Sequence, residues 1–165
     1  MGISVFGNIN YFVGKSKLLD ALAIFCARFL PYLMVAFLFG FCFYRNDVRL
    51  FFYAILSGVF ARVVINELVH LFYKRQRPPR VVEAKVLIPL PKNYSFPSGH
   101  ASFFFGLSFL LLFFEKDLAI IFIVLTCIVT VSRVFCGVHW FRDILAGALA
   151  GFISAIIIYY LFNLI

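Results

Sequence analysis

A short polar stretch between two apolar runs, SRVFCGVHWFRD at residues 132–143, carries the side chains best suited to chemistry. His139 and Asp143 are four residues apart, so they share a face if a helix begins there. A carboxylate that accepts from one imidazole nitrogen fixes the tautomer and leaves the other nitrogen free to attack. Arg133 adds a cation at the end of the preceding run. The stretch predicts a nucleophile with its orienting group. The alternative is a structural His/Asp pair, in which the two side chains only satisfy each other's hydrogen bonds.

A second polar motif, PSGHAS at residues 97–102, directly precedes another apolar run. Ser98 is a natural helix N-cap, and Gly99 lets a ligand approach the backbone closely. The first amides of a helix bind phosphate through their free N–H groups and the helix dipole. His100 would then lie beside a bound anion. An ordinary cap followed by an interfacial histidine is the alternative.

Basic residues form a third motif, HLFYKRQRP at residues 70–78, which offers Lys74, Arg75 and Arg77 within one or two helical turns. Guanidinium groups present a fork of donors that suits phosphate oxygens. Such clusters also anchor helix ends at the membrane surface, so this motif is ambiguous by itself.

Upstream of that motif, Arg62, Asn66 and His70 recur every four residues along one face of an apolar segment. Ionisable groups at that depth should face a polar interior.

The elements that hold these residues are predicted to be membrane helices. The chain of 165 residues is 64% hydrophobic and 13% charged, well below the charge content of soluble proteins. Its apolar runs are near the ~20 residues that a spanning helix needs. We expect an all-α membrane protein, a single domain over residues 1–165, with about five spanning helices at residues 18–44, 48–73, 99–115, 118–136 and 142–164.

The remaining segments contain no pattern typical of a signal peptide, a metal site or a nucleotide site. Residues 1–17 lack a spanning run and a cleavage pattern, so we expect an interfacial segment rather than a signal peptide. The cysteines show no zinc spacing, and no dinucleotide or Walker-type loop is present. We therefore predict no metal, no cofactor and no nucleic-acid partner, and the sequence does not indicate an oligomeric state.

The five-helix topology places all three motifs on one face, together with a long active-site loop at residues 74–98 and most of the basic residues. The positive-inside rule alone would explain the charge. We favour an anion site, because orientation needs charge but not the accompanying Pro-Ser-Gly-His and second histidine. Phosphoryl transfer requires clamped oxygens, an in-line nucleophile and an acid for the departing oxygen, and the three motifs supply each of these.

The order and spacing of these motifs resemble the type 2 phosphatidic acid phosphatase superfamily over the last ~95 residues. The resemblance implies a metal-independent phosphatase in which His139 forms a phosphohistidine, Asp143 orients it and His100 protonates the leaving group. It also implies a phosphate-binding set of Arg77, Ser98, Gly99 and Arg133. The family's first motif begins with a lysine seven residues before Arg77, where this chain has His70. Lys74, Arg75 or His70 is expected to take that role.

Within the family, the small size and the run LIPLPKNYSFPSGHASF are most similar to bacterial undecaprenyl diphosphate phosphatases. The expected partners are therefore a membrane lipid phosphate and the lipid bilayer. Enzymes acting on phosphatidylglycerophosphate or on the 1-phosphate of lipid A are alternatives within the family. A non-catalytic anion binder or transporter is the alternative of another class, and a vanadium haloperoxidase is disfavoured because those enzymes are large and soluble.

The orientation in the bacterial cytoplasmic membrane is predicted in two opposite ways. The basic excess favours a cytoplasmic catalytic face, whereas the resemblance implies an extracytoplasmic one. We follow the resemblance, because residues recruited to bind phosphate are not free topogenic signals.

Overall fold

The computed structural model describes residues 2–163, and the side chains of residues 5–163. Residue 1 of the predicted interfacial segment and residue 164 of the last predicted span lie outside the described residues. The described chain is helical, with α1 (Gly2–Asn10), α2 (Lys17–Arg28), α3 (Leu30–Tyr44), α4 (Val48–Val59), the π-helix η1 (Phe60–Ile65), α5 (Asn66–Phe72), the 3₁₀ helix η2 (Pro78–Arg80), α6 (Gly99–Leu111), α7 (Lys116–Phe135) and α8 (Phe141–Asn163). The predicted all-α membrane class is confirmed.

Fewer helices than the five predicted runs are individually long and apolar enough to span a membrane. Three continuous helices are long and apolar enough to cross a bilayer: Val48–Phe72 with 25 residues, α7 with 20 and α8 with 23. α2 and α3, which bend by 47° at their junction, can form a fourth span together. The remaining predicted run corresponds to α6, which has only 13 residues. In the described residues the count is therefore three, or four with the bent pair.

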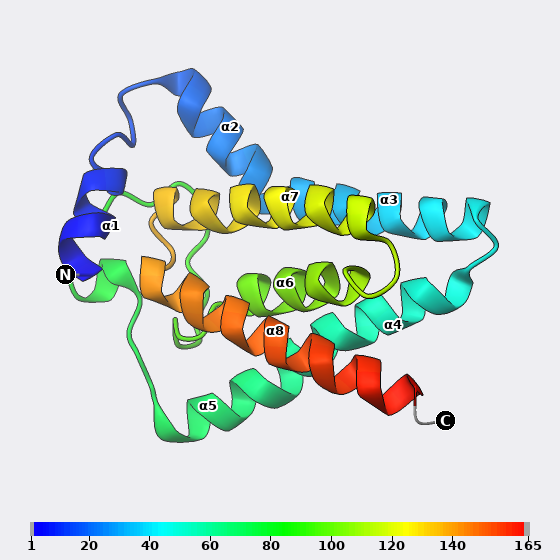
Figure 1. Ribbon diagram of the computed structural model, residues 1–165. Coiled ribbons are helices and arrows are strands. Elements are labelled where there is room, and N and C mark those ends of the chain that lie inside the picture. Colours follow the sequence, from blue (N-terminus) through cyan, green and yellow to red (C-terminus); the bar gives the residue numbers. More distant parts are fainter. Residues whose placement is uncertain (1, 164–165) are drawn as a thin grey trace.

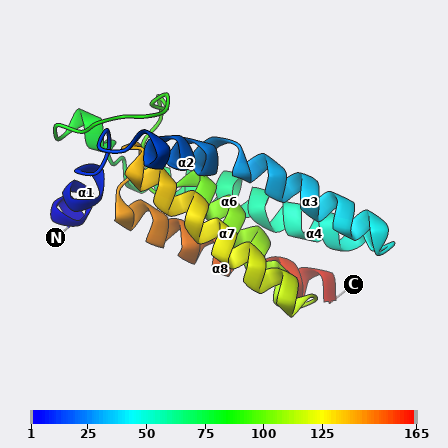
Figure 2. The same cartoon turned by 90° about the horizontal axis from the view of Figure 1, so that it is seen from above.

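The short helix α6 occupies the centre of the bundle, where it packs against α4, α7 and α8 (Figures 1 and 2). Most of its residues are buried in protein. A helix buried in protein and a helix buried in lipid have the same apolar composition, which explains why hydropathy alone predicted a fifth span. Close packing needs glycine here, because a Cβ on Gly151 of α8 would lie 2.5 Å from the backbone nitrogen of Gly106 in α6.

The polar segments gather at one end of the bundle (Figure 1). This end carries α1, the long connection between α5 and α6, the first turn of α6 and the turn between α7 and α8. The predicted N-terminal segment forms α1, whose Phe6 is buried with its ring centroid 5.1 Å from that of Trp140. The N-terminal helix is thus packed against the residue that directly follows His139.

Candidate active site

A cavity of about 120 Å³ lies at this polar end. Six of the predicted site residues line it, and they come from all three motifs: His70, Arg77, Gly99, His100, Arg133 and His139. The folded chain thus brings together residues that are up to 69 positions apart, from His70 to His139. Of the other predicted residues, Asp143 and Ser98 lie behind the wall, while Lys74 and Arg75 do not line the cavity.

His139 and Asp143 are close, but not for the reason predicted from their spacing. α8 begins at Phe141, so His139 belongs to the preceding turn and only Asp143 is helical. That turn is tight because Gly137 has a φ of +80°, a conformation that glycine adopts without strain. Nδ1 of His139 lies 3.1 Å from the carbonyl oxygen of Ser95 and 3.4 Å from Oδ2 of Asp143. Both neighbours are acceptors, which assigns the proton to Nδ1 and the lone pair to Nε2.

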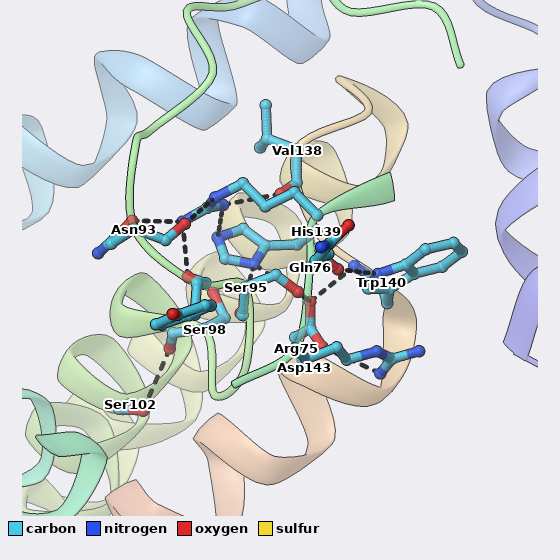
Figure 3. Close-up of polar contacts among 12 residues, drawn as sticks. Arg75, Gln76, Asn93, Ser95, Ser98, Ser102, Val138, His139, Trp140 and Asp143 are labelled. Carbon is cyan, nitrogen blue, oxygen red and sulfur yellow. Dashed lines mark hydrogen bonds and ion pairs between the residues drawn. The ribbon is translucent and has the colours of Figure 1, made fainter. Parts of the chain in front are cut away.

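The carboxylate of Asp143 is completely buried and is held by three donors (Figure 3). Oδ2 accepts from the Ser95 hydroxyl at 2.6 Å and from the Trp140 amide at 2.9 Å, and Oδ1 accepts from Arg75 Nη1 at 3.1 Å. A buried carboxylate needs such compensation, because an unpaired charge in the interior is costly. Ser95, which sequence reasoning did not select, therefore contacts both members of the pair.

Arg77 is 3% exposed and directs all of its N–H groups at protein atoms. Nε donates to the carbonyl of Asn93 at 3.0 Å, and Nη2 donates to the Asn93 side chain at 2.8 Å and to the Tyr94 carbonyl at 3.1 Å. Nη1 donates to the Val138 carbonyl at 2.8 Å and lies 3.2 Å from Nε2 of His139. Arg77 thus fastens the long loop to the turn that carries His139.

His100 and Arg133 meet on another wall of the cavity. Nη1 of Arg133 lies 3.4 Å from Nε2 of His100 and donates to the carbonyl of Ala27 in α2 at 3.2 Å. Arg133 is 6% exposed, and its Nε has no hydrogen-bond partner among the described residues. A buried unpaired donor is expensive unless a ligand completes it. The wall is therefore suited to an anion.

The N-terminus of α6 has the predicted position but not the predicted cap. Ser98 is the N-cap residue, yet its hydroxyl makes no capping bond and is buried without a partner in the described part of the chain. Its backbone amide instead donates to the Asp143 carbonyl at 3.0 Å. Gly99 lines the cavity, and a Cβ at this position would lie 3.5 Å from Nε of Arg62. The first turn of α6 is therefore tied to α8 and open to the cavity.

The three candidates for the role of the first-motif lysine differ in their position relative to the cavity. Arg75 does not line the cavity; its guanidinium is paired with Asp143 and lies 5.0 Å from the Trp140 ring. Lys74 is exposed, and its Nζ lies 5.9 Å from the ring of the wall residue Tyr94, so it is outside the cavity. His70 lines the cavity; its Nδ1 faces Glu67 at 3.4 Å, and its buried Nε2 has no partner among the described residues. The geometry therefore favours His70.

Arg62 and Asn66 also line the cavity, two turns and one turn before His70 respectively. Their four-residue spacing predicted a polar interior, and the cavity is that interior. Arg62 lies in the π-helix η1 and Asn66 directly follows it; such a local widening of the helix is frequent at functional sites. Asn66 is buried and accepts from the Ser102 hydroxyl at 2.9 Å.

The electrostatics of the cavity keep His139 neutral. Burial lowers the pKa of His139 to about 4, with Arg133 and Arg77 acting in the same direction and Asp143 opposing them. Burial also lowers the pKa of Arg77 to about 10, which leaves it charged at neutral pH. The site therefore presents a neutral imidazole beside fixed cations, an arrangement that can attack a bound phosphoryl group.

Comparison with known proteins gives consistent results. The sequence model of the PAP2 superfamily matches residues 47–165. The bacitracin transport permease protein BcrC of Bacillus licheniformis is 28% identical over 97% of this chain and 80% of that protein. The undecaprenyl-diphosphatase BcrC of Bacillus subtilis is 30% identical over 98% of this chain and 82% of that protein. Among solved structures, Aquifex aeolicus LpxE superposes with a TM-score of 0.75 and 26% identity, covering 96% of this chain and 94% of LpxE.

Proposed function

The chain belongs to the PAP2 superfamily, and from this premise we propose that it hydrolyses the terminal phosphate of a membrane lipid, with undecaprenyl diphosphate as the substrate. The chain is an integral membrane protein, with its polar cavity at one end of the apolar bundle. The single observation that carries the proposal is the grouping of His139, His100 and Arg77 around that cavity. The name of the Bacillus subtilis relative supports the choice of substrate.

The proposed first step is attack by Nε2 of His139 on the terminal phosphorus. The lone pair of Nε2 forms the N–P bond, the P–O bond to the bridging oxygen breaks, and its electrons remain on the departing lipid phosphate. Asp143 and the carbonyl of Ser95 hold the proton on Nδ1 and support the positive charge that forms on the ring. His100, which lines the same cavity, protonates the leaving oxygen where a proton is needed.

The second step is hydrolysis of the phosphohistidine. His100 in its unprotonated form accepts a proton from water, the water oxygen bonds to phosphorus, and the electrons of the N–P bond return to His139. Inorganic phosphate and the free imidazole are the products. Arg133, Arg77 and the first amides of α6 would hold the phosphoryl oxygens in both steps; no step is assigned to a metal ion.

A non-catalytic binder or a transporter would need the cations but not an oriented neutral imidazole. Phosphate release by purified protein from undecaprenyl diphosphate distinguishes these classes. We expect turnover by the wild-type protein, none by His139→Ala, and wild-type turnover by Arg142→Gln, which alters an exposed arginine outside the cavity. Equal phosphate release by wild type and His139→Ala would refute the proposal.

We also propose that the catalytic face is extracytoplasmic. Arg75, Arg77 and Arg133 are each bonded within the protein, which supports treating them as site residues rather than topogenic signals. Lys92 is exposed in the long loop, so a Lys92→Cys variant tests the orientation. We expect labelling by a membrane-impermeant thiol reagent on intact cells. Labelling only after the cells are opened would place the face in the cytoplasm.

A further inference from the structure

An apolar groove of about 320 Å³ meets the catalytic cavity at two shared residues, Arg62 and His100. Its other walls come from the first turns of α3 and the second turn of α6: Pro31, Tyr32, Val35, Phe103 and Phe104. Tyr32 is 76% exposed, so the groove reaches the outer surface of the bundle. The groove is therefore a path between the cavity and the surrounding lipid.

The position of His139 relative to these two spaces gives the path a direction. His139 lines the cavity but not the groove. In an in-line displacement the leaving oxygen departs on the side opposite to the nucleophile. A lipid tail is attached to that leaving oxygen and must stay in an apolar environment. The groove is apolar and is bordered by His100, the residue proposed to protonate the leaving oxygen.

Arg62, at this border, is exposed, and its guanidinium makes no hydrogen bond or salt bridge with the described residues. Arg77, in contrast, is buried and directs its N–H groups at protein acceptors. Its Nε is nevertheless placed against the first turn of α6, since it is the nearest atom to a Cβ built on Gly99. Arg62 is thus a positioned cation between the cavity and the groove.

The charge of the leaving group decides when such a cation matters. A lipid monophosphate leaves as an alcohol, which needs the proton of His100 and carries no charge after accepting it. A lipid diphosphate leaves as a lipid phosphate, which carries a charge of about −1.5 to −2 at neutral pH because the second pKa of a phosphate monoester is about 6. Only the second leaving group retains a charge that Arg62 can neutralise.

We propose that Arg62 and the groove form a leaving-group subsite, in which Arg62 binds the phosphate next to the tail and the groove holds the hydrocarbon chain. The subsite makes the enzyme selective for lipid diphosphates over lipid monophosphates. This inference rests on the proposed function, because it presupposes attack from the His139 side.

Matched substrates with one tail, farnesyl diphosphate and farnesyl monophosphate, test the selectivity of purified protein. Loss of a charge-assisted contact should lower kcat/KM of Arg62→Gln for the diphosphate by about 10- to 100-fold, with the monophosphate unaffected. Arg62→Lys should recover part of the loss because it keeps the charge, and Arg142→Gln serves as the control. An equal loss on both substrates, or no loss on either, would overturn the inference. Failure of the wild-type protein to hydrolyse undecaprenyl diphosphate as well as both farnesyl substrates would overturn the proposed function and this inference with it.

The tail path has its own test. Val35→Trp narrows the groove, whereas Phe43→Trp alters an exposed position of α3 outside the groove. We expect Val35→Trp to lower kcat/KM for undecaprenyl diphosphate relative to isopentenyl diphosphate, and Phe43→Trp to leave that ratio unchanged. An unchanged ratio in Val35→Trp would exclude the groove as the tail site.

Discussion

Nη1 of Arg77 lies 3.2 Å from Nε2 of His139. Arginine only donates, so Nε2 is the acceptor in this contact. The nitrogen proposed to attack phosphorus is thus the one that Arg77 contacts. Substrate must replace this contact, and the displaced N–H group of Arg77 then becomes available to a phosphoryl oxygen.

Replacement of Arg77 by lysine should lower both activity and stability. Lysine offers one ammonium in place of the planar fork, so it cannot serve the carbonyls of Asn93, Tyr94 and Val138 together. We expect a fall in kcat/KM of about 10- to 100-fold and a lower midpoint of thermal unfolding. Arg80→Lys, at an exposed position of the same loop, is the control. Wild-type values for Arg77→Lys would show that the loop is held by other contacts.

The low pKa of His139 predicts its behaviour in acid. An ordinary histidine has a pKa near 6.5, so at pH 5.5 most of its molecules are protonated. His139, with a pKa of about 4, stays neutral at that pH. The chain has three histidines, and the nitrogen resonances of a ¹⁵N-histidine sample can be assigned with His139→Gln. We expect the His139 resonances to stay those of the neutral ring down to about pH 5. Titration near 6.5 would contradict the buried neutral imidazole.

The same pKa has a consequence for stability. The unfolded chain binds the proton of this residue more tightly than the folded chain, so protonation favours unfolding. The contribution of His139 is fully present above about 6.5 and is lost as the pH falls toward about 4. The acid dependence of the unfolding midpoint should therefore be shallower in His139→Gln than in the wild type, and equal slopes would argue against the shift.

Asp143→Asn should impair catalysis while leaving the basic side chains of the cavity in place. If the amide oxygen takes the place of Oδ2, it still accepts from Ser95 and Trp140, but the amide nitrogen then faces Arg75. In the flipped amide the nitrogen faces Nδ1 of His139 instead. Either orientation removes the negative charge beside the imidazole, which we expect to lower kcat by about 10²- to 10⁴-fold. Asp117→Asn, at an exposed position near the far end of α7, is the control. Retention of wild-type kcat would remove Asp143 from the mechanism.

The N-terminal helix is predicted to support the site through Asn10. Its side chain donates to the carbonyls of Lys85 and Phe135 and accepts from the Lys85 amide, which joins α1 to the long loop and to the end of α7. Asn10→Ala removes these partly buried hydrogen bonds, each of which contributes about 0.5–1.5 kcal/mol. We expect lower thermal stability and a lower kcat, whereas Asn8→Ala, at an exposed position, should behave as wild type. Equal stability of the two variants would show that the hydrogen bonds of Asn10 do not hold α1 to the long loop and α7.

Sequence reasoning was most successful for residues whose chemistry is expressed by local spacing. The three motifs contain Arg77, His100, Arg133 and His139, all of which line the cavity. The four-residue spacing of Arg62, Asn66 and His70 indicated a polar interior that the cavity matches. Their gathering followed from topology, because alternating helices return the chain to the same end.

The contacts that the sequence did not predict are those between residues that only tertiary structure brings together. Arg75 belongs to the same basic cluster as Arg77, but the fold turns it toward Asp143, 68 residues away. Ser95 lies in a loop with no motif, so its contact with Asp143 has no local signal. Whether an apolar run is covered by lipid or by protein is likewise decided by packing, which is why α6 was counted as a span.

The most direct test of the central claim is to trap the covalent intermediate. Purified protein is mixed with undecaprenyl diphosphate labelled with ³²P in the terminal phosphate, quenched in alkali to preserve phosphohistidine, and the labelled peptide is identified. We expect acid-labile phosphate on His139, and none in His139→Ala. Label on another residue, or full turnover by His139→Ala, would contradict it.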